Sequence, residues 1–154
     1  KYLYGKQIKD PEEFYFPQIK KGAPKAELKD PSLQEEKFQS FKDGLKFKDL
    51  EEGYGIVPTP GGRCYVHYTG WLSDGTKYAS TIGGIPLTFK YADGEVIRGL
   101  DEGITGMKAG GVRKLIVPPH LAYGDKGSEK LKVPPGETLT IIVKLLTSGK
   151  QRNF

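Results

Sequence analysis

The 154-residue sequence is poor in the residue types from which most catalytic and metal sites are built. It has one cysteine, Cys64, and two histidines, His67 and His120. No internal disulfide can therefore form, and a cysteine–histidine metal cluster is not expected. The sequence contains no plausible Ser-His-Asp set, and its glycine-rich stretches suit turns better than phosphate loops. Its apolar runs fall far short of the roughly 20 residues that a membrane-spanning helix needs.

The sequence also lacks long runs of positively or negatively charged residues. Lys and Arg number 24 against 19 Asp and Glu, which gives a net charge of +5. The basic residues are scattered among acidic ones and do not alternate with aromatic residues, so we expect no nucleic-acid partner. The length suits one domain with an appendage. The sequence begins at Lys1 rather than Met, which fits a processed chain that has lost a targeting segment.

Residues 1–44 differ from the rest in their frequent prolines, which are Pro11, Pro17, Pro24 and Pro31. Prolines at this spacing oppose a long helix or a central strand. A short helix is predicted over residues 32–41, because Ser32 and Glu35 have the spacing of a capping box.

The same region holds seven of the seventeen aromatic residues, whereas disordered linkers are usually poor in them. The cluster Phe14, Tyr15 and Phe16 therefore reads as an anchor onto a surface. That surface is either another protein or the chain's own domain. We take residues 1–44 as an N-terminal docking arm that binds a partner, and keep packing on the chain's own domain and disorder as the alternatives.

Residues 45–148 show the signals of a single α+β domain, followed by a C-terminal tail over residues 149–154. Alternating or apolar segments bounded by turn residues predict strands, and they cover residues 45–50, 64–68, 87–89, 112–117 and 138–146. One helix is predicted from residue 95, with five apolar residues on one face and Gly106 at its end. These five are Val96, Ile97, Leu100, Ile104 and Met107. The expected architecture is an antiparallel sheet wrapped over one short helix.

Three motifs in order resemble the FKBP-type peptidyl-prolyl cis-trans isomerases, the rotamases of the immunophilin group. They are VHYTGWLSDG at residues 66–75, EVIRGLDEG at 95–103, and PHLAYG at 119–124 followed by Pro134 and Pro135. The resemblance implies a half-barrel of five or six antiparallel strands around the helix, with a pocket between them. It also implies a proline-containing peptide or protein as substrate and no cofactor.

The chemistry of such a site explains why the sequence can lack the usual catalytic residues. An X–Pro bond is a tertiary amide with a rotation barrier of about 18–20 kcal/mol. Water favours the charge-separated amide resonance, so an apolar pocket eases rotation without a nucleophile or metal. The resemblance makes Tyr68 and Tyr123 the catalytic residues, with the Tyr123 hydroxyl donating to a bound carbonyl. The implied pocket lining is Tyr78, Leu87, Phe89, Val96, Ile97, Leu100, Val133 and Ile141. For several of these, ordinary core packing is the alternative reading.

The sequence also departs from the family pattern. Leu100 stands where the family has a pocket-floor Trp, and Ala79 stands where it has an acidic residue. Leu87 and Ile141 replace aromatic residues, and the loop after Ser80 lacks the usual Arg. Each change could weaken proline binding by about 1–2 kcal/mol, on the scale of large-to-small substitutions. We therefore predict an eroded pocket with weak or absent isomerase activity. The expected role is an auxiliary subunit or assembly helper, and an active broad-specificity isomerase is the alternative.

The overall sequence style is similar to the plant chloroplast immunophilins of the thylakoid lumen. This likeness implies a location in that lumen, peripheral to the membrane, and membership of a larger complex such as the photosynthetic NDH-like complex. No membrane anchor is visible, so attachment is expected through the N-terminal arm. A bacterial or other organellar member of the family is the rival interpretation.

Overall fold

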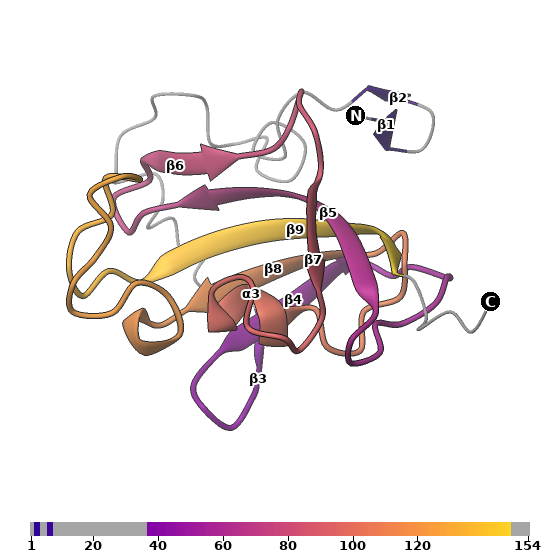
Figure 1. Cartoon of the computed structure of the whole chain (residues 1–154), viewed down its shortest axis with the longest axis horizontal. Helices are drawn as coiled ribbons and strands as arrows, with labels where there is room; N and C mark the ends of the chain where they lie inside the picture. Colours follow the sequence, from indigo (N-terminus) through magenta and orange to yellow (C-terminus); the bar gives the residue numbers. More distant parts are fainter. Residues whose placement is uncertain (1, 4–5, 8–36, 149–154) are drawn as a thin grey trace.

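The structure, a computed structural model, describes residues 2–3, 6–7 and 37–148. Its main element is a seven-stranded antiparallel sheet with the order β3-β4-β8-β9-β5-β6, in which β7 also pairs with β5 (Figure 1). The strands are β3 Gln39–Ser40, β4 Lys46–Glu51, β5 Arg63–Trp71, β6 Lys77–Ser80, β7 Leu87–Lys90, β8 Val112–Val117 and β9 Leu139–Ser148. A separate two-stranded sheet joins β1 (Tyr2–Leu3) to β2 (Lys6–Gln7).

One short helix, α3 (Arg98–Gly103), packs against β8 and lies in front of it in Figure 1. A single turn of 3₁₀ helix, η2 (Pro119–Leu121), follows β8. The α+β fold class predicted from the sequence is confirmed. In the described ranges, no helix is long and apolar enough to cross a bilayer.

Two glycines allow α3 to approach the sheet closely. A Cβ added at Gly99 would collide with a methyl group of Val117, and one at Gly103 would collide with Leu115. Since Leu115 and Val117 are both fully buried, the face of the sheet toward α3 is the inner, apolar face. Alternation along β9 places Leu139, Ile141, Val143 and Leu145 on that same face, and all four are buried.

The helix begins three residues later than the sequence pattern predicted. Val96 and Ile97 precede it, and Ile97 is extended with ψ of 147°. The Ile97 carbonyl accepts hydrogen bonds from the N–H groups of Leu100 and Asp101 at 3.1 and 3.0 Å. The predicted end was also too late, because the helix stops at Gly103 and Gly106 lies in the following turn with φ of +79°.

The prediction of a helix over residues 32–41 is wrong in the part that the structure describes. Gln39 and Ser40 form β3 and pair with Phe47 and Lys46 of β4. Phe41 then packs against Phe47, with ring centroids 4.8 Å apart. Hairpin pairing with β4 therefore overrides the capping signal, and residues 39–41 belong to the sheet domain.

Candidate functional site

Three tyrosines from different parts of the chain gather at the margin of the main apolar cluster. Tyr68 comes from β5, Tyr78 from β6, and Tyr123 from the segment after η2. The rings of Tyr78 and Tyr123 meet edge to face, with centroids 6.5 Å apart and an angle of 85°. All three are partly buried and pack against the main apolar cluster. An edge-to-face pair is a favoured aromatic geometry, so it holds the two phenol rings in a defined orientation.

Burial raises the pKa of each of these three hydroxyls. The pKa of Tyr78 is raised most by burial and then by the neighbouring phenols of Tyr123 and Tyr68. Burial alone raises the pKa of Tyr68, and burial together with Tyr68 raises the pKa of Tyr123. The three side chains are therefore neutral at physiological pH and available as hydroxyl donors in an apolar setting.

The strand arrangement explains how Tyr68 is held. The residues Arg63–Val66 of β5 pair with β7, whereas Thr69–Trp71 pair with β6, so Tyr68 lies where the partner strand changes. The Thr81 hydroxyl accepts a hydrogen bond from the Tyr68 N–H at 3.0 Å, and the Thr81 N–H donates to the Tyr68 carbonyl at 2.9 Å. The backbone of Tyr68 is thus fixed at a fork in the sheet.

Tyr78 depends on a neighbouring glycine. A Cβ at Gly70, the residue paired with Ala79 across β5 and β6, would collide with the Tyr78 ring and lie 2.8 Å from its hydroxyl oxygen. The aromatic side chain therefore lies directly over the Gly70 backbone. Because only glycine leaves this space, the position of the Tyr78 ring is linked to a residue that carries no functional group of its own.

The other predicted pocket residues converge on the same apolar cluster, but at different depths. Leu87, Val96 and Ile97 are partly buried at its margin. The fully enclosed members are Phe89, Leu100, Val133 and Ile141, with exposed fractions of 0 to 4%. The first group can touch a ligand together with the tyrosines. Phe89 and Ile141, at 0% and 1%, can only support these side chains from below.

Sequence reasoning missed Leu131, which also packs against the cluster. It lies in a lysine-rich loop between Lys126 and Val133. This loop is ordered by a bridge between Ser128 and Val133, and the Ser128 hydroxyl accepts a hydrogen bond from the Leu131 N–H at 3.2 Å. The one available signal was a single leucine between Lys130 and Lys132.

A second residue that sequence reasoning missed is Asp101, an acid buried on α3. Its carboxylate accepts hydrogen bonds from the N–H groups of Ala92 and Gly94 at 2.7 and 3.2 Å. These bonds tie the turn before α3 to the helix, and they fix the path of the intervening Val96 and Ile97.

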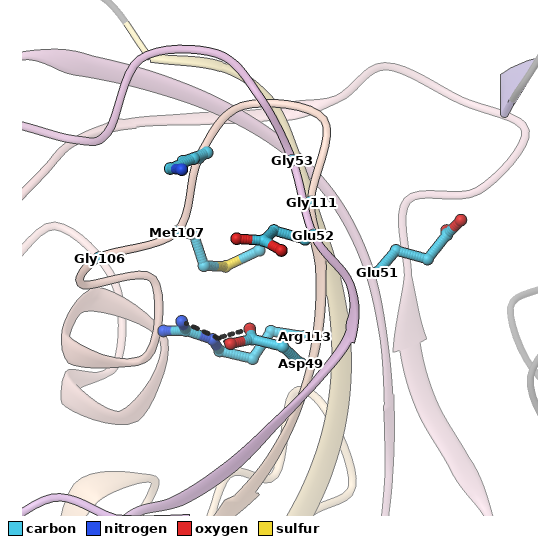
Figure 2. A pocket seen from close by; sticks show the side chains of 9 residues that line it. Asp49, Glu51, Glu52, Gly53, Gly106, Met107, Gly111 and Arg113 are labelled. Carbon is cyan, nitrogen blue, oxygen red and sulfur yellow. Dashed lines mark hydrogen bonds and ion pairs between the residues drawn. The ribbon is translucent and has the colours of Figure 1, made fainter.

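A separate charged hollow is lined by none of the predicted pocket residues (Figure 2). Its lining includes Asp49, Glu51, Glu52 and Arg113. The Arg113 Nε donates to Asp49 at 2.7 Å, and one Nη donates to the carbonyls of Gly103 and Thr105 at 2.9 and 2.7 Å. The guanidinium thus holds the end of α3 against the sheet. Over the residues that the structure describes, no three His, Cys, Asp or Glu side chains are grouped to hold a metal ion.

The predicted partner-binding residues Phe14, Tyr15 and Phe16 lie outside the described residues. The position of these three side chains is therefore not part of the site geometry.

Comparison with known proteins identifies relatives over this region. Residues 55–146 match the family described as FKBP-type peptidyl-prolyl cis-trans isomerase. An FK506-binding protein of Neisseria meningitidis serogroup B is 46% identical over 104 residues, which cover 67% of this chain and 94% of that protein. The chloroplastic peptidyl-prolyl cis-trans isomerase FKBP16-4 of Arabidopsis thaliana is 38% identical over 135 residues, which cover 82% of this chain and 57% of that protein.

Two solved structures of similar proteins have the same fold. The crystal structure of AtFKBP13 superposes with a TM-score of 0.68 at 36% identity, covering 73% of this chain and 99% of that one. FkpA from Escherichia coli superposes with a TM-score of 0.70 at 34% identity, covering 83% of this chain and 59% of that one.

Proposed function

Because the chain belongs to the family of FKBP-type peptidyl-prolyl cis-trans isomerases, we propose that it binds X–Pro segments between Tyr68, Tyr78 and Tyr123 and isomerises them slowly. The observation that carries this proposal is the gathering of three neutral phenols at the margin of an apolar cluster. That arrangement supplies both requirements of the reaction, an apolar environment for the amide and a hydroxyl donor for a carbonyl.

The proposed catalysis involves no bond breaking. Transfer of the X–Pro amide from water to the apolar margin removes the solvent that stabilises its planar, charge-separated form. The Tyr123 hydroxyl donates to a carbonyl of the bound segment and holds it in place while the prolyl bond rotates. The edge-to-face contact of Tyr78 with Tyr123 restricts the orientation of this donor.

We propose that the activity is weak because the pocket floor is built from a small side chain. Leu100 is 3% exposed and occupies the floor with a branched aliphatic group. It offers neither the large rigid surface nor the N–H donor of an indole ring. Ala79, beside Tyr78, contributes no charge to order the rim. The pocket should accept many X–Pro sequences with low affinity.

The test is a protease-coupled isomerase assay on a short X–Pro peptide, comparing the chain with a Tyr68→Phe, Tyr123→Phe double variant. A net hydrogen bond contributes about 0.5–1.5 kcal/mol, so the double variant should lose roughly tenfold or more in kcat/KM. Tyr54→Phe is the matched control, because Tyr54 is 87% exposed and is not among the residues that pack against the apolar cluster. A wild-type rate equal to the uncatalysed rate would refute an enzymatic role.

A second candidate function is that of an auxiliary subunit or assembly helper in a larger membrane complex, such as an NDH-like complex of the thylakoid lumen. The observation that favours it is the chloroplastic relative that aligns with 82% of the chain. The test is rescue of a strain that lacks the protein. If the Tyr68→Phe, Tyr123→Phe variant restores the complex as well as the wild type does, the role is structural; failure to restore it favours isomerisation.

A further inference from the structure

A carboxylate joins the turn between β5 and β6 to the chain segment that leads into β9. The N–H and the hydroxyl of Ser73, in that turn, both donate to Oε2 of Glu137, at 2.6 and 2.8 Å. The two segments meet at the left edge of Figure 1, beyond the last paired residues of β5 and β9, which are Trp71 and Thr140. Hydrogen bonds to a carboxylate are stronger than those between neutral groups. Glu137 therefore extends the connection past the point where strand pairing ends.

The same contact closes a circuit that passes through two of the three site tyrosines. Tyr78 follows the turn on β6, and its ring meets the ring of Tyr123 edge to face. The carbonyl of Gly124, the next residue, accepts a hydrogen bond from the N–H of Gly136 at 2.9 Å. Gly136 is followed by Glu137, whose carboxylate returns to the turn. The ring contact, the backbone hydrogen bond and the carboxylate are thus three non-covalent links of one closed circuit.

The other two links of this circuit are loosely held. Gly124 and Gly136 have φ of +62° and +69°, and a Cβ added at either would meet no atom within 4 Å, so packing does not brace the backbone link at these positions. Pro134 and Pro135, which precede Gly136, are exposed. Edge-to-face aromatic pairs tolerate centroid distances of about 4.5–7 Å, so the rings alone do not fix their separation. The carboxylate of Glu137 is the link that restrains the circuit.

We propose that Glu137 is a positioning residue for the isomerase site and sets the separation of Tyr78 and Tyr123 before a substrate binds. This inference rests on the proposed binding of X–Pro segments between the tyrosines. Without the carboxylate, the loop that begins at Tyr123 moves away from β6 in part of the population, and only the remainder presents a formed pocket. The apparent affinity for substrate falls by that fraction. Bound substrate restores the pocket, so turnover of the complex changes little.

The first test is steady-state isomerase kinetics on Glu137→Ala. We expect KM to rise roughly fivefold while kcat stays within about twofold. A merely structural role would lower the folded fraction, and with it the apparent kcat, and would leave KM unchanged. Glu137→Gln keeps an acceptor oxygen for Ser73 and should recover most of the wild-type KM. Glu129→Ala is the matched control, because it removes the same charge from the same loop, and Glu129 is exposed with no side-chain partner among residues 37–148.

The second test needs no catalysis. With isotopically labelled tyrosine rings, the NMR cross-peak between the ring protons of Tyr78 and Tyr123 reports their separation. It should lose most of its intensity in Glu137→Ala and keep its intensity in Glu129→Ala. Ser73→Ala removes one of the two donors, so a smaller loss is expected, with no further loss when it is added to Glu137→Ala, because the two residues share one contact. If Glu137→Ala fails to fold, judged by near-UV circular dichroism, Ser73→Ala carries both tests.

Three outcomes would overturn the proposal. With an active wild type, an unchanged KM in Glu137→Ala would mean that the carboxylate does not prepare the pocket. An equal rise of KM in Glu129→Ala would assign the effect to lost charge. Persistence of the full cross-peak in Glu137→Ala would mean that other contacts set the separation of the phenols. If the wild-type rate equals the uncatalysed rate, the proposed function fails by itself, and the cross-peak alone decides whether Glu137 positions the two rings.

Discussion

The close approach of α3 to β8 allows a sharp test of how Leu100, the proposed pocket floor, is positioned. In Gly99→Ala, the added Cβ would collide with a Val117 methyl group and lie 3.2 Å from the Leu121 carbonyl oxygen. Ordinary contacts require about 3.5–4 Å, so α3 must retreat from the sheet by on the order of 1 Å. Overpacking of this kind costs about 1–3 kcal/mol, against a gain of about 1 kcal/mol from replacing glycine in a helix. We expect a net loss of about 1 kcal/mol of unfolding free energy.

The functional effect of Gly99→Ala should exceed its effect on stability, because Leu100 moves with the helix. A displacement of about 1 Å can cost on the order of a hundredfold in rate, so we expect at least a tenfold loss of kcat/KM. Urea denaturation and the coupled isomerase assay measure the two effects.

Val117→Ala in the same chain removes the opposing methyl groups and should restore much of the activity. Arg98→Ala is the control on the same helix, since that side chain is 64% exposed and its loss should change neither quantity appreciably. The steric argument would be refuted if Gly99→Ala raised the unfolding free energy by the full helix-propensity gain and kept its activity.

The remaining predictions concern the ionisable groups of the domain. Because the folded-state pKa values of Tyr68, Tyr78 and Tyr123 are raised, their stabilising effect is complete below the unfolded pKa of about 10 and is lost as pH rises toward the folded values. The unfolding free energy should fall above pH 10 by up to about 1.4 kcal/mol per pH unit per group. Urea midpoints between pH 8 and 11.5 measure this slope, and an unchanged slope in Tyr78→Phe would contradict it. Separately, Arg113→Met should cost about 2–4 kcal/mol, since it leaves two carbonyls at the end of α3 without their donor. Urea denaturation tests this value, and a loss below about 0.5 kcal/mol would show that the guanidinium does not hold the helix end.

Much of the fold follows from patterns within the chain. Alternation located β8 to the residue, and turn residues bounded β7 closely, whereas β5 continues three residues past the predicted end at Tyr68. The helix boundaries were less accurate, because Val96 and Ile97 satisfy a helical period even though they are extended. Their conformation follows a contact between distant groups, the Asp101 carboxylate and the N–H groups of Ala92 and Gly94, which no periodicity reveals.

The residues of the candidate site could be predicted from the sequence, but the burial of each side chain could not. The family motifs supplied Tyr68, Tyr78 and Tyr123, which the fold brings together. The motifs did not show that Phe89 and Ile141 are enclosed, because both faces of a strand can carry apolar residues. Leu131 was missed for the opposite reason, since its charged neighbours in the loop gave no apolar pattern.

The position of β9 between β5 and β8 determines the order in which the domain can assemble. Tyr68 pairs with Val143, and Leu115 pairs with Ile141, so both central seams of the sheet require β9, which follows all the other strands of this sheet in the sequence. Folding must then close a loop of about seventy residues before the core exists, and contacts this distant in sequence are associated with slow folding. On the ribosome, β5 and β8 would each keep an open edge until β9 emerges. We therefore expect a protein that is proposed to rearrange prolyl bonds in other chains to fold slowly itself, with an interval in which its own strands need protection from aggregation.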